Sequence, residues 1–165
     1  MSNSPERIES LSQYGKLLAE LARGRVDFAV CGGLAVIFNG YARFTLDTDI
    51  IVGDSTENIE RLLSTLANWG EGFAKELSLD DFTSEEGAVR LVEDFELDIF
   101  TRLRGKSLED FRPNLRFLEW ENARIPYLSA ADLIHCKQNS AREKDQIDVA
   151  ALTEIQRHEL NLPPA

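Results

Sequence analysis

Two aspartates lie inside an otherwise apolar, strand-like segment, and this placement limits what the 165-residue chain can fold into. The segment, residues 47–52, reads Asp-Thr-Asp-Ile-Ile-Val and is closed by Gly53. Aspartate is disfavoured inside strands, and side chains two residues apart in a strand share one face. We therefore expect Asp47 and Asp49 side by side, where their carboxylates repel each other unless a cation lies between them.

A short apolar run upstream ends in a pair of glycines. Residues 27–31 (Asp-Phe-Ala-Val-Cys) predict a buried strand, and Leu34–Phe38 predicts a buried helix after the turn at Gly32-Gly33. A glycine pair lets the backbone approach a ligand closely, and the N–H groups at the start of a helix can bind a phosphate. The segment therefore predicts a phosphate site next to the acidic strand.

A third acid occurs in the same kind of setting further along the chain. Asp98 lies between aliphatic residues in the strand-like segment Phe-Glu-Leu-Asp-Ile-Phe, residues 95–100. Three carboxylates from two strands can hold two divalent ions about 3.5–4 Å apart, and Mg²⁺ takes substrate phosphates as its other ligands. We expect two Mg²⁺ or Mn²⁺ ions on Asp47, Asp49 and Asp98, with Glu96 and Asp94 as alternatives for the third acid.

The remaining pattern predicts one domain of the α/β (α+β) class, a mixed sheet flanked by helices. A helix is expected from Ser4 to Gly24 with an apolar face running from Ile8 to Leu21, and another after Ser55. Residues 71–82 leave helix and loop open. Further strands are expected at 89–92, 96–101, 116–120 and 124–128, then helices from Ser129 to about Ser140 and from about Arg142 to His158. We expect residues 1–128 to form the core and 129–160 to form C-terminal helices packed on it.

Composition narrows the classes of partner and compartment. Lys and Arg number 18 against 29 Asp and Glu, a net charge of −11 that argues against a general nucleic-acid coat protein. The two cysteines, Cys31 and Cys136, lie far apart in apolar stretches and suggest reduced thiols. Neither a basic-then-apolar leader nor an apolar run of about 18 residues is visible. We expect a soluble, cytoplasmic protein without a membrane segment.

The ordered motifs resemble those of a known family. Gly32-Gly33, thirteen intervening residues, then Asp47-Thr48-Asp49-Ile50 and a third acid on a later strand is similar to the nucleotidyltransferase superfamily of the DNA polymerase β type. Residues 40–50 resemble most the small stand-alone bacterial and archaeal nucleotidyltransferases, including AbiEii-type toxins and antibiotic-modifying enzymes. Residues 133–137 and 142–148 resemble the segment that follows the core in these proteins.

The resemblance implies the nucleotidyltransferase fold and the transfer of a nucleoside monophosphate from an NTP to an acceptor hydroxyl, with release of pyrophosphate. By this resemblance Asp47 and Asp49 bind the metal ions, and Asp98 binds the catalytic metal and helps to deprotonate the acceptor. The residues expected to bind the nucleotide's phosphates are Gly32, Gly33, Arg43 and Lys137.

Several alternatives stay open at this level. The chain could be a non-catalytic nucleotide-binding or partner-binding module of a toxin–antitoxin type system, with an antitoxin as its partner, or a nuclease or phosphatase using the same acids. The acceptor could be a small molecule, a protein or an RNA end, and the net charge disfavours the RNA. Arg142, Lys144, Asp145 and Asp148 could form a structural ion-pair cluster, with Lys144 facing Asp148 across one helical turn.

Overall fold

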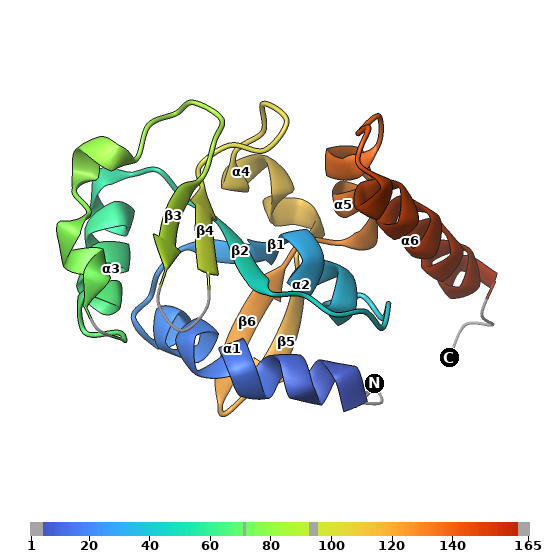
Figure 1. Cartoon of the computed structure of the whole chain (residues 1–165), viewed down its shortest axis with the longest axis horizontal. Helices are drawn as coiled ribbons and strands as arrows, with labels where there is room; N and C mark the ends of the chain where they lie inside the picture. Colours follow the sequence, from blue (N-terminus) through green and yellow to red (C-terminus); the bar gives the residue numbers. More distant parts are fainter. Residues whose placement is uncertain (1–4, 71, 93–95, 162–165) are drawn as a thin grey trace.

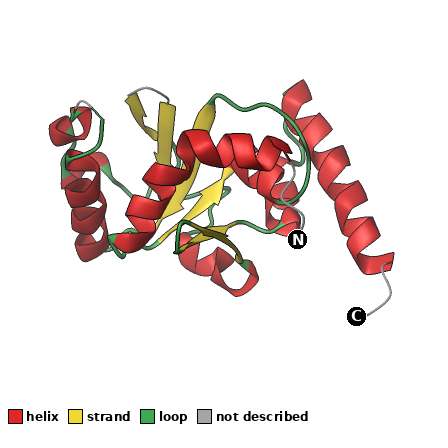
Figure 2. Ribbon diagram, turned by 90° about the horizontal axis from the view of Figure 1, so that it is seen from below, coloured by secondary structure: helices red, strands yellow, loops and turns green. Residues whose placement is uncertain are grey.

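One mixed sheet organises the molecule, with helices on its faces and at one end (Figures 1 and 2). The computed structural model describes residues 5–70, 72–92 and 96–161, and in these ranges six strands pair in the order β3-β4-β2-β1-β6-β5. The strands are β1 (Phe28–Cys31), β2 (Asp47–Val52), β3 (Val89–Val92), β4 (Glu96–Phe100), β5 (Arg116–Trp120) and β6 (Ala123–Tyr127). The α-helices are α1 (Pro5–Arg23), α2 (Gly32–Phe38), α3 (Thr56–Ala67), α4 (Leu108–Phe111), α5 (Ala130–Lys137) and α6 (Glu143–Asn161).

The strand directions confirm the predicted mixed sheet and α+β class. Three neighbouring pairs, β1 with β2, β3 with β4 and β5 with β6, run antiparallel. β2 with β4 and β1 with β6 run parallel. All four residues of β1 are buried, as expected of a central strand covered on both faces. β1 and β2 therefore form the middle of the sheet, where the acidic segment lies.

The helices begin where the sequence places capping residues. Ser55 accepts a hydrogen bond from the Asn58 backbone N–H at the start of α3, and Ser129 accepts one from Asp132 N–H at the start of α5. Such side-chain caps satisfy N–H groups that lack a partner within the helix. α2 starts at Gly32 itself, two residues earlier than the apolar run indicates, and Gly32 makes the turn out of β1 with a positive φ of 62°.

Other boundaries differ from the sequence expectation. Residues 71–82 contain two 3₁₀-helices, Phe73–Glu76 and Leu79–Asp81. α4 was not predicted, although Ser107 and Asp110 form the same capping box that marks helices elsewhere. α5 ends at Lys137, three residues before the expected Ser140. Asp94 and the side chains of Ile8 and Leu11 lie outside the described residues.

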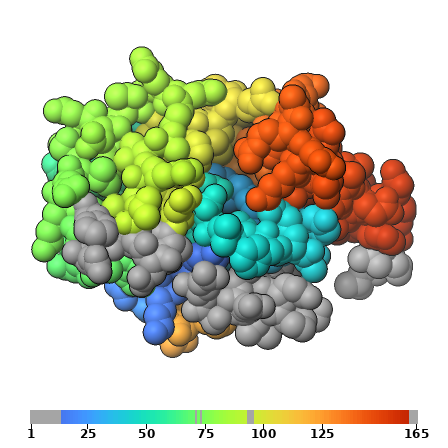
Figure 3. Space-filling model, viewed as in Figure 1, coloured from blue at the N-terminus to red at the C-terminus, as the bar shows by residue number. Residues whose placement is uncertain are grey.

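The two C-terminal helices stand beside the sheet and bound a hollow. α5 and α6 lie at one end of the molecule, away from α3 at the other (Figure 1). Figure 3 shows the surface hollowed between the β3–β4 region and these helices, with β2 and its preceding loop beneath. Within the described residues, none of the helices has the length and apolar character needed to cross a membrane.

Candidate active site

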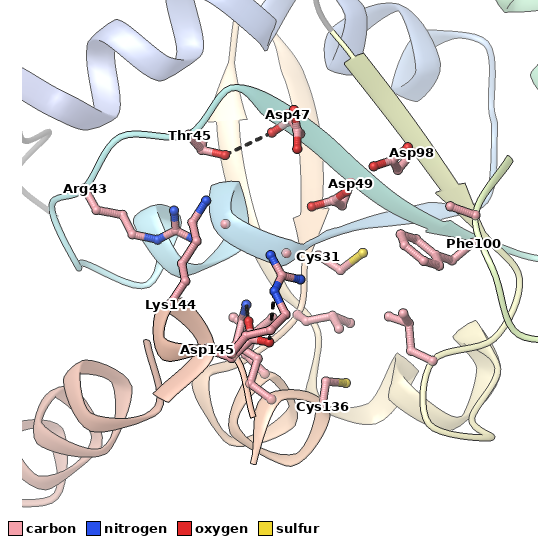
Figure 4. Close-up of a pocket in the computed structure, with 18 of the residues that line it drawn as sticks. Cys31, Arg43, Thr45, Asp47, Asp49, Asp98, Phe100, Cys136, Lys144 and Asp145 are labelled. Atoms are coloured by element: carbon pink, nitrogen blue, oxygen red, sulfur yellow. Dashed lines mark hydrogen bonds and ion pairs between the residues drawn. The ribbon is translucent and has the colours of Figure 1, made fainter. Parts of the chain in front are cut away.

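A row of ionisable side chains crosses the four neighbouring strands β1, β2, β4 and β3. Cys31 of β1 is the register partner of Asp49 of β2, Asp49 is the partner of Asp98 of β4, and Asp98 is the partner of Arg90 of β3. Asp47 lies two residues before Asp49 and so shares its face of the sheet. The carboxyl groups of Asp47, Asp49 and Asp98 face the same cavity (Figure 4).

The cavity has about 440 Å³ of space and two opposite walls of different charge. The sheet supplies the three aspartates and Arg90, while the loop before β2, α5 and α6 supply basic groups together with Asp145. All seven site residues predicted from the sequence line it: Gly32, Gly33, Arg43, Asp47, Asp49, Asp98 and Lys137. The structure therefore brings together residues that are up to 105 positions apart in the sequence.

Asp49 is the acid most strongly affected by its surroundings. Burial raises its pKa to about 7, and the neighbouring charges of Asp98 and then Asp47 add to the rise. Asp98 is itself only 5% exposed. Packing carboxylates together out of water disfavours their ionised forms unless a positive charge compensates them. A cation bound at Asp47 and Asp49 would therefore stabilise their ionised forms.

The glycine pair allows the acids to approach the start of α2. A Cβ atom on Gly32 would collide with the Asp49 carboxylate, and the φ of 62° is a conformation that other residues rarely adopt. A Cβ on Gly33 would lie 2.6 Å from Arg43 Nη2 and 3.0 Å from Thr45 Oγ1. Both glycines are needed because site side chains occupy the space where a Cβ would point.

Arg43 and Lys137 are both paired with acids from α6. Arg43 Nε lies 2.9 Å from Asp148 Oδ1, and Lys137 Nζ lies 3.1 Å from Asp148 Oδ2. Lys137 Nζ also lies 3.1 Å from Asp145 Oδ1. Asp145 and Asp148 therefore do take part in an ion-pair cluster, but the buried Asp148 carboxylate is held by Arg43 and Lys137 and not, as the alternative had it, by Lys144.

Arg90 is the site residue that the sequence reading missed. Its Nε and Nη2 donate to the two Asp98 oxygens at 2.8 and 3.0 Å, and its Nη1 lies 3.3 Å from Glu96. Glu96 is register partner to Asp47, but its side chain is not among those that line the cavity. Arg90 is the only charged residue in the segment Val-Arg-Leu-Val, and that is the signal that could have marked it.

The two thiols at the cavity floor are not activated as nucleophiles. Burial raises the pKa of Cys31 well above its usual value, and burial together with Asp132 raises the pKa of Cys136 to about 11. Both are therefore neutral thiols near pH 7, and a thiol is a poor nucleophile compared with a thiolate. Neither of these thiols supplies the chemistry of the cavity.

Asp47 and Asp49 suit one hard divalent cation. In the described ranges no three His, Cys, Asp or Glu side chains are grouped so that they could hold a metal ion. Mg²⁺, however, commonly takes one or two carboxylates and completes its shell with water and substrate phosphates. The carboxylate pair, with the raised pKa of Asp49, fits such a partial protein shell.

Solved structures with similar backbones identify the fold. A predicted nucleotidyltransferase from Thermotoga maritima superimposes with a TM-score of 0.56 at 22% identity, covering 94% of each chain. The chain has the nucleotidyltransferase fold. A nucleotidyltransferase-like protein that is an antigen of Paracoccidioides brasiliensis aligns over 92% of this chain and 77% of its own, with a TM-score of 0.54 and 16% identity.

A third neighbour with the nucleotidyltransferase fold carries a bound antibiotic. It is the lincosamide antibiotic adenylyltransferase LnuA with lincomycin, which aligns over 92% of this chain and 98% of its own with a TM-score of 0.54 and 15% identity. No protein-family model and no curated protein matches the sequence. At these identities the likeness concerns the fold alone.

Proposed function

We propose that the protein is a divalent-metal-dependent nucleotidyltransferase that moves a nucleoside monophosphate from an NTP to an acceptor hydroxyl. The observation that carries the proposal is the cavity in which Asp47, Asp49 and Asp98 face a basic wall across a nucleotide-sized space. The nucleotidyltransferase fold of the whole chain supports the same reading.

Asp47 and Asp49 are assigned to the metal, and the basic wall to the phosphates. A divalent ion held there would neutralise charge that develops on the transferred phosphoryl group. Arg142 and Lys144 are exposed at the cavity mouth, where they can meet a triphosphate. Arg43 and Lys137 lie deeper, where their remaining N–H groups can donate to phosphate oxygens while Asp145 and Asp148 hold them in place.

The reaction is a substitution at the α-phosphorus of the NTP. The acceptor oxygen forms a new bond to this phosphorus, the bond to the oxygen bridging the α- and β-phosphates breaks, and pyrophosphate leaves with that electron pair. We assign the hydroxyl proton to the Asp98 carboxylate, whose oxygens keep lone pairs beyond their contacts with Arg90. The protein's own contribution is orientation of the two reactants and fixed charge around the phosphorus.

The acceptor is expected on the Asp98 side of the cavity. Phe100 lies beside Asp98 (Figure 4), and Ala88 and Leu103 are further apolar residues of the lining, whereas Arg43 and Lys144 lie on the other side of the cavity. This apolar wall and the net charge of −11 favour a small molecule or a protein hydroxyl over an RNA end. The toxin–antitoxin alternative would use the same nucleotide site without turnover.

The test is transfer of label from each of the four α-³²P-labelled NTPs into small molecules, protein or RNA of a cell extract with Mg²⁺. We expect labelling with at least one NTP, and its loss in Asp47→Asn and Asp49→Asn. Asp54→Asn is the matched control, because Asp54 is an acid just beyond β2 that pairs with Arg102 outside the cavity. Equal labelling by the Asp47→Asn variant would contradict the proposal. Calorimetric binding of Mg-NTP without labelling of any fraction would indicate the non-catalytic module.

A further inference from the structure

Arg90 makes a two-point contact with the carboxylate of Asp98, the third acid of the site. Two of its guanidinium nitrogens contact the two oxygens of Asp98 in a fork-to-fork arrangement, at 2.8 and 3.0 Å. A third nitrogen lies 3.3 Å from Glu96. Bidentate arginine–carboxylate pairs are among the strongest charge-assisted contacts in proteins, and arginine keeps its charge at every relevant pH.

The positive charge of Arg90 lies on the Asp98 side of the acids. Arg90 contacts both Asp98 and Glu96, so its single positive charge neutralises one of these two acids. Asp47 and Asp49 together carry two further negative charges when ionised, and one divalent ion balances these two. A second divalent ion on Asp98 would lie against the positively charged Arg90 guanidinium, which contacts both oxygens of the carboxylate and would repel the ion.

The strand arrangement holds Arg90 in this position. Arg90 and Asp98 are register partners on the antiparallel strands β3 and β4, so their side chains leave the sheet on the same face. Leu91 and Val89, its neighbours on β3, pack on the core side. Both residues line the cavity, and Arg90 is the more exposed member of the pair, with 54% of its side chain exposed against 7% for Asp98.

We propose that Arg90 replaces a second divalent ion: the site holds one ion on Asp47 and Asp49, and Arg90 supplies the positive charge on the acceptor side. This rests on the proposed function and departs from the two ions that the sequence resemblance implies. In the transfer, the guanidinium keeps Asp98 pointed at the acceptor hydroxyl and has further N–H groups free to meet the phosphoryl oxygens. Arg90 thereby acts as a positioning residue for Asp98.

The test counts bound Mn²⁺ at pH 8 by electron paramagnetic resonance of the free ion, with Mn²⁺ alone as the probe. We expect one ion per chain for the unaltered protein. Arg90→Gln removes the charge and keeps much of the side chain, and we expect it to bind two ions, or to bind the first about tenfold more tightly. The matched control is Arg116→Gln. Arg116 lies on β5, makes a similar two-point contact with Glu159 of α6, and does not line the cavity. This variant should bind one ion with unchanged affinity.

The proposal would be overturned if the unaltered protein bound two Mn²⁺ ions. It would also be overturned if Arg90→Gln bound the same number of Mn²⁺ ions as the unaltered protein, with the same affinity. A second variant covers poor folding of Arg90→Gln: Asp98→Asn should still bind one ion, whereas loss of that ion would place a metal on Asp98 and also overturn it. These outcomes are distinct from failure of the proposed function, which would appear as absence of label transfer while the ion count stays as expected.

Discussion

At the scale of single residues, Asp49 is the group whose ionisation controls the site. Its pKa of about 7 arises from burial and from Asp98 and Asp47, so a proton and a divalent ion compete for the same carboxylate near neutral pH. We expect Mn²⁺ affinity to fall about tenfold for each pH unit below 7 and to level off above pH 8. Titrations at pH 6, 7 and 8 would measure this, and equal affinity at all three would show that Asp49 does not bind the ion.

The same carboxyl group makes the folded protein sensitive to pH when no divalent ion is bound. An aspartate has a pKa of about 3.9 in an unfolded chain. Between pH 4 and 7 the folded form retains the Asp49 proton and the unfolded form has lost it, so stability falls as the pH rises through this range. Asp49→Asn removes this loss, and we expect it to be more stable than the parent by up to about 4 kcal/mol at pH 8, from a rise of about three pKa units at about 1.4 kcal/mol each.

Urea unfolding in EDTA at pH 5 and pH 8 measures the difference. Asp54→Asn serves as the control, since Asp54 is partly exposed and outside the cavity. The gain for Asp49→Asn should shrink at pH 5, where the side chain at position 49 is neutral in the folded parent as well as in the folded variant. An Asp49→Asn variant less stable than the parent at pH 8 would contradict the raised pKa.

At the scale of elements, one buried carboxylate joins α6 to the rest of the molecule. Asp148 is fully buried and contacts Arg43 from the loop before β2 and Lys137 from α5. Asp148→Ala leaves both cations without their shared partner, and breaking a buried pair in this way costs about 3–5 kcal/mol. Glu159→Gln is the control on the same helix: its pair with Arg116 is partly exposed, and we expect a loss below about 1 kcal/mol. Equal losses in urea unfolding would contradict the role of Asp148.

The sequence alone predicts those elements that have a local signal, but not the contacts between distant elements. β2 and the glycine turn were predictable because an acid-x-acid pattern in an apolar run and a Gly-Gly pair are local signals. The contact of Arg90 with Asp98 depends on β3 pairing with β4, and the contacts of Asp148 depend on how α6 packs on α5. Both are long-range outcomes of topology, with no periodicity to reveal them. The four-residue α4 is too short to show a helical repeat, so only its capping box could mark it.

At the scale of the whole molecule, the cavity joins segments that lie far apart in the sequence, so a ligand bound there should stabilise the whole domain. Its lining runs from Cys31 to Asp145 and joins the sheet to the C-terminal helices. A ligand that binds only the folded form at about 100 times its Kd adds about 2.7 kcal/mol to the free energy of unfolding. For a domain of this length that corresponds to a rise in Tm of roughly 5–10 °C.

We expect this rise with Mg²⁺ and the NTP that labels best, and little rise with the same NTP in EDTA, because the phosphates would then face Asp47 and Asp49 without a cation between them. Scanning calorimetry of the intact chain measures it. The Asp47→Asn variant should shift less than the parent, while Asp54→Asn should shift equally. A full rise in EDTA would mean that the basic wall alone binds the nucleotide and that the acids play no part in its recognition.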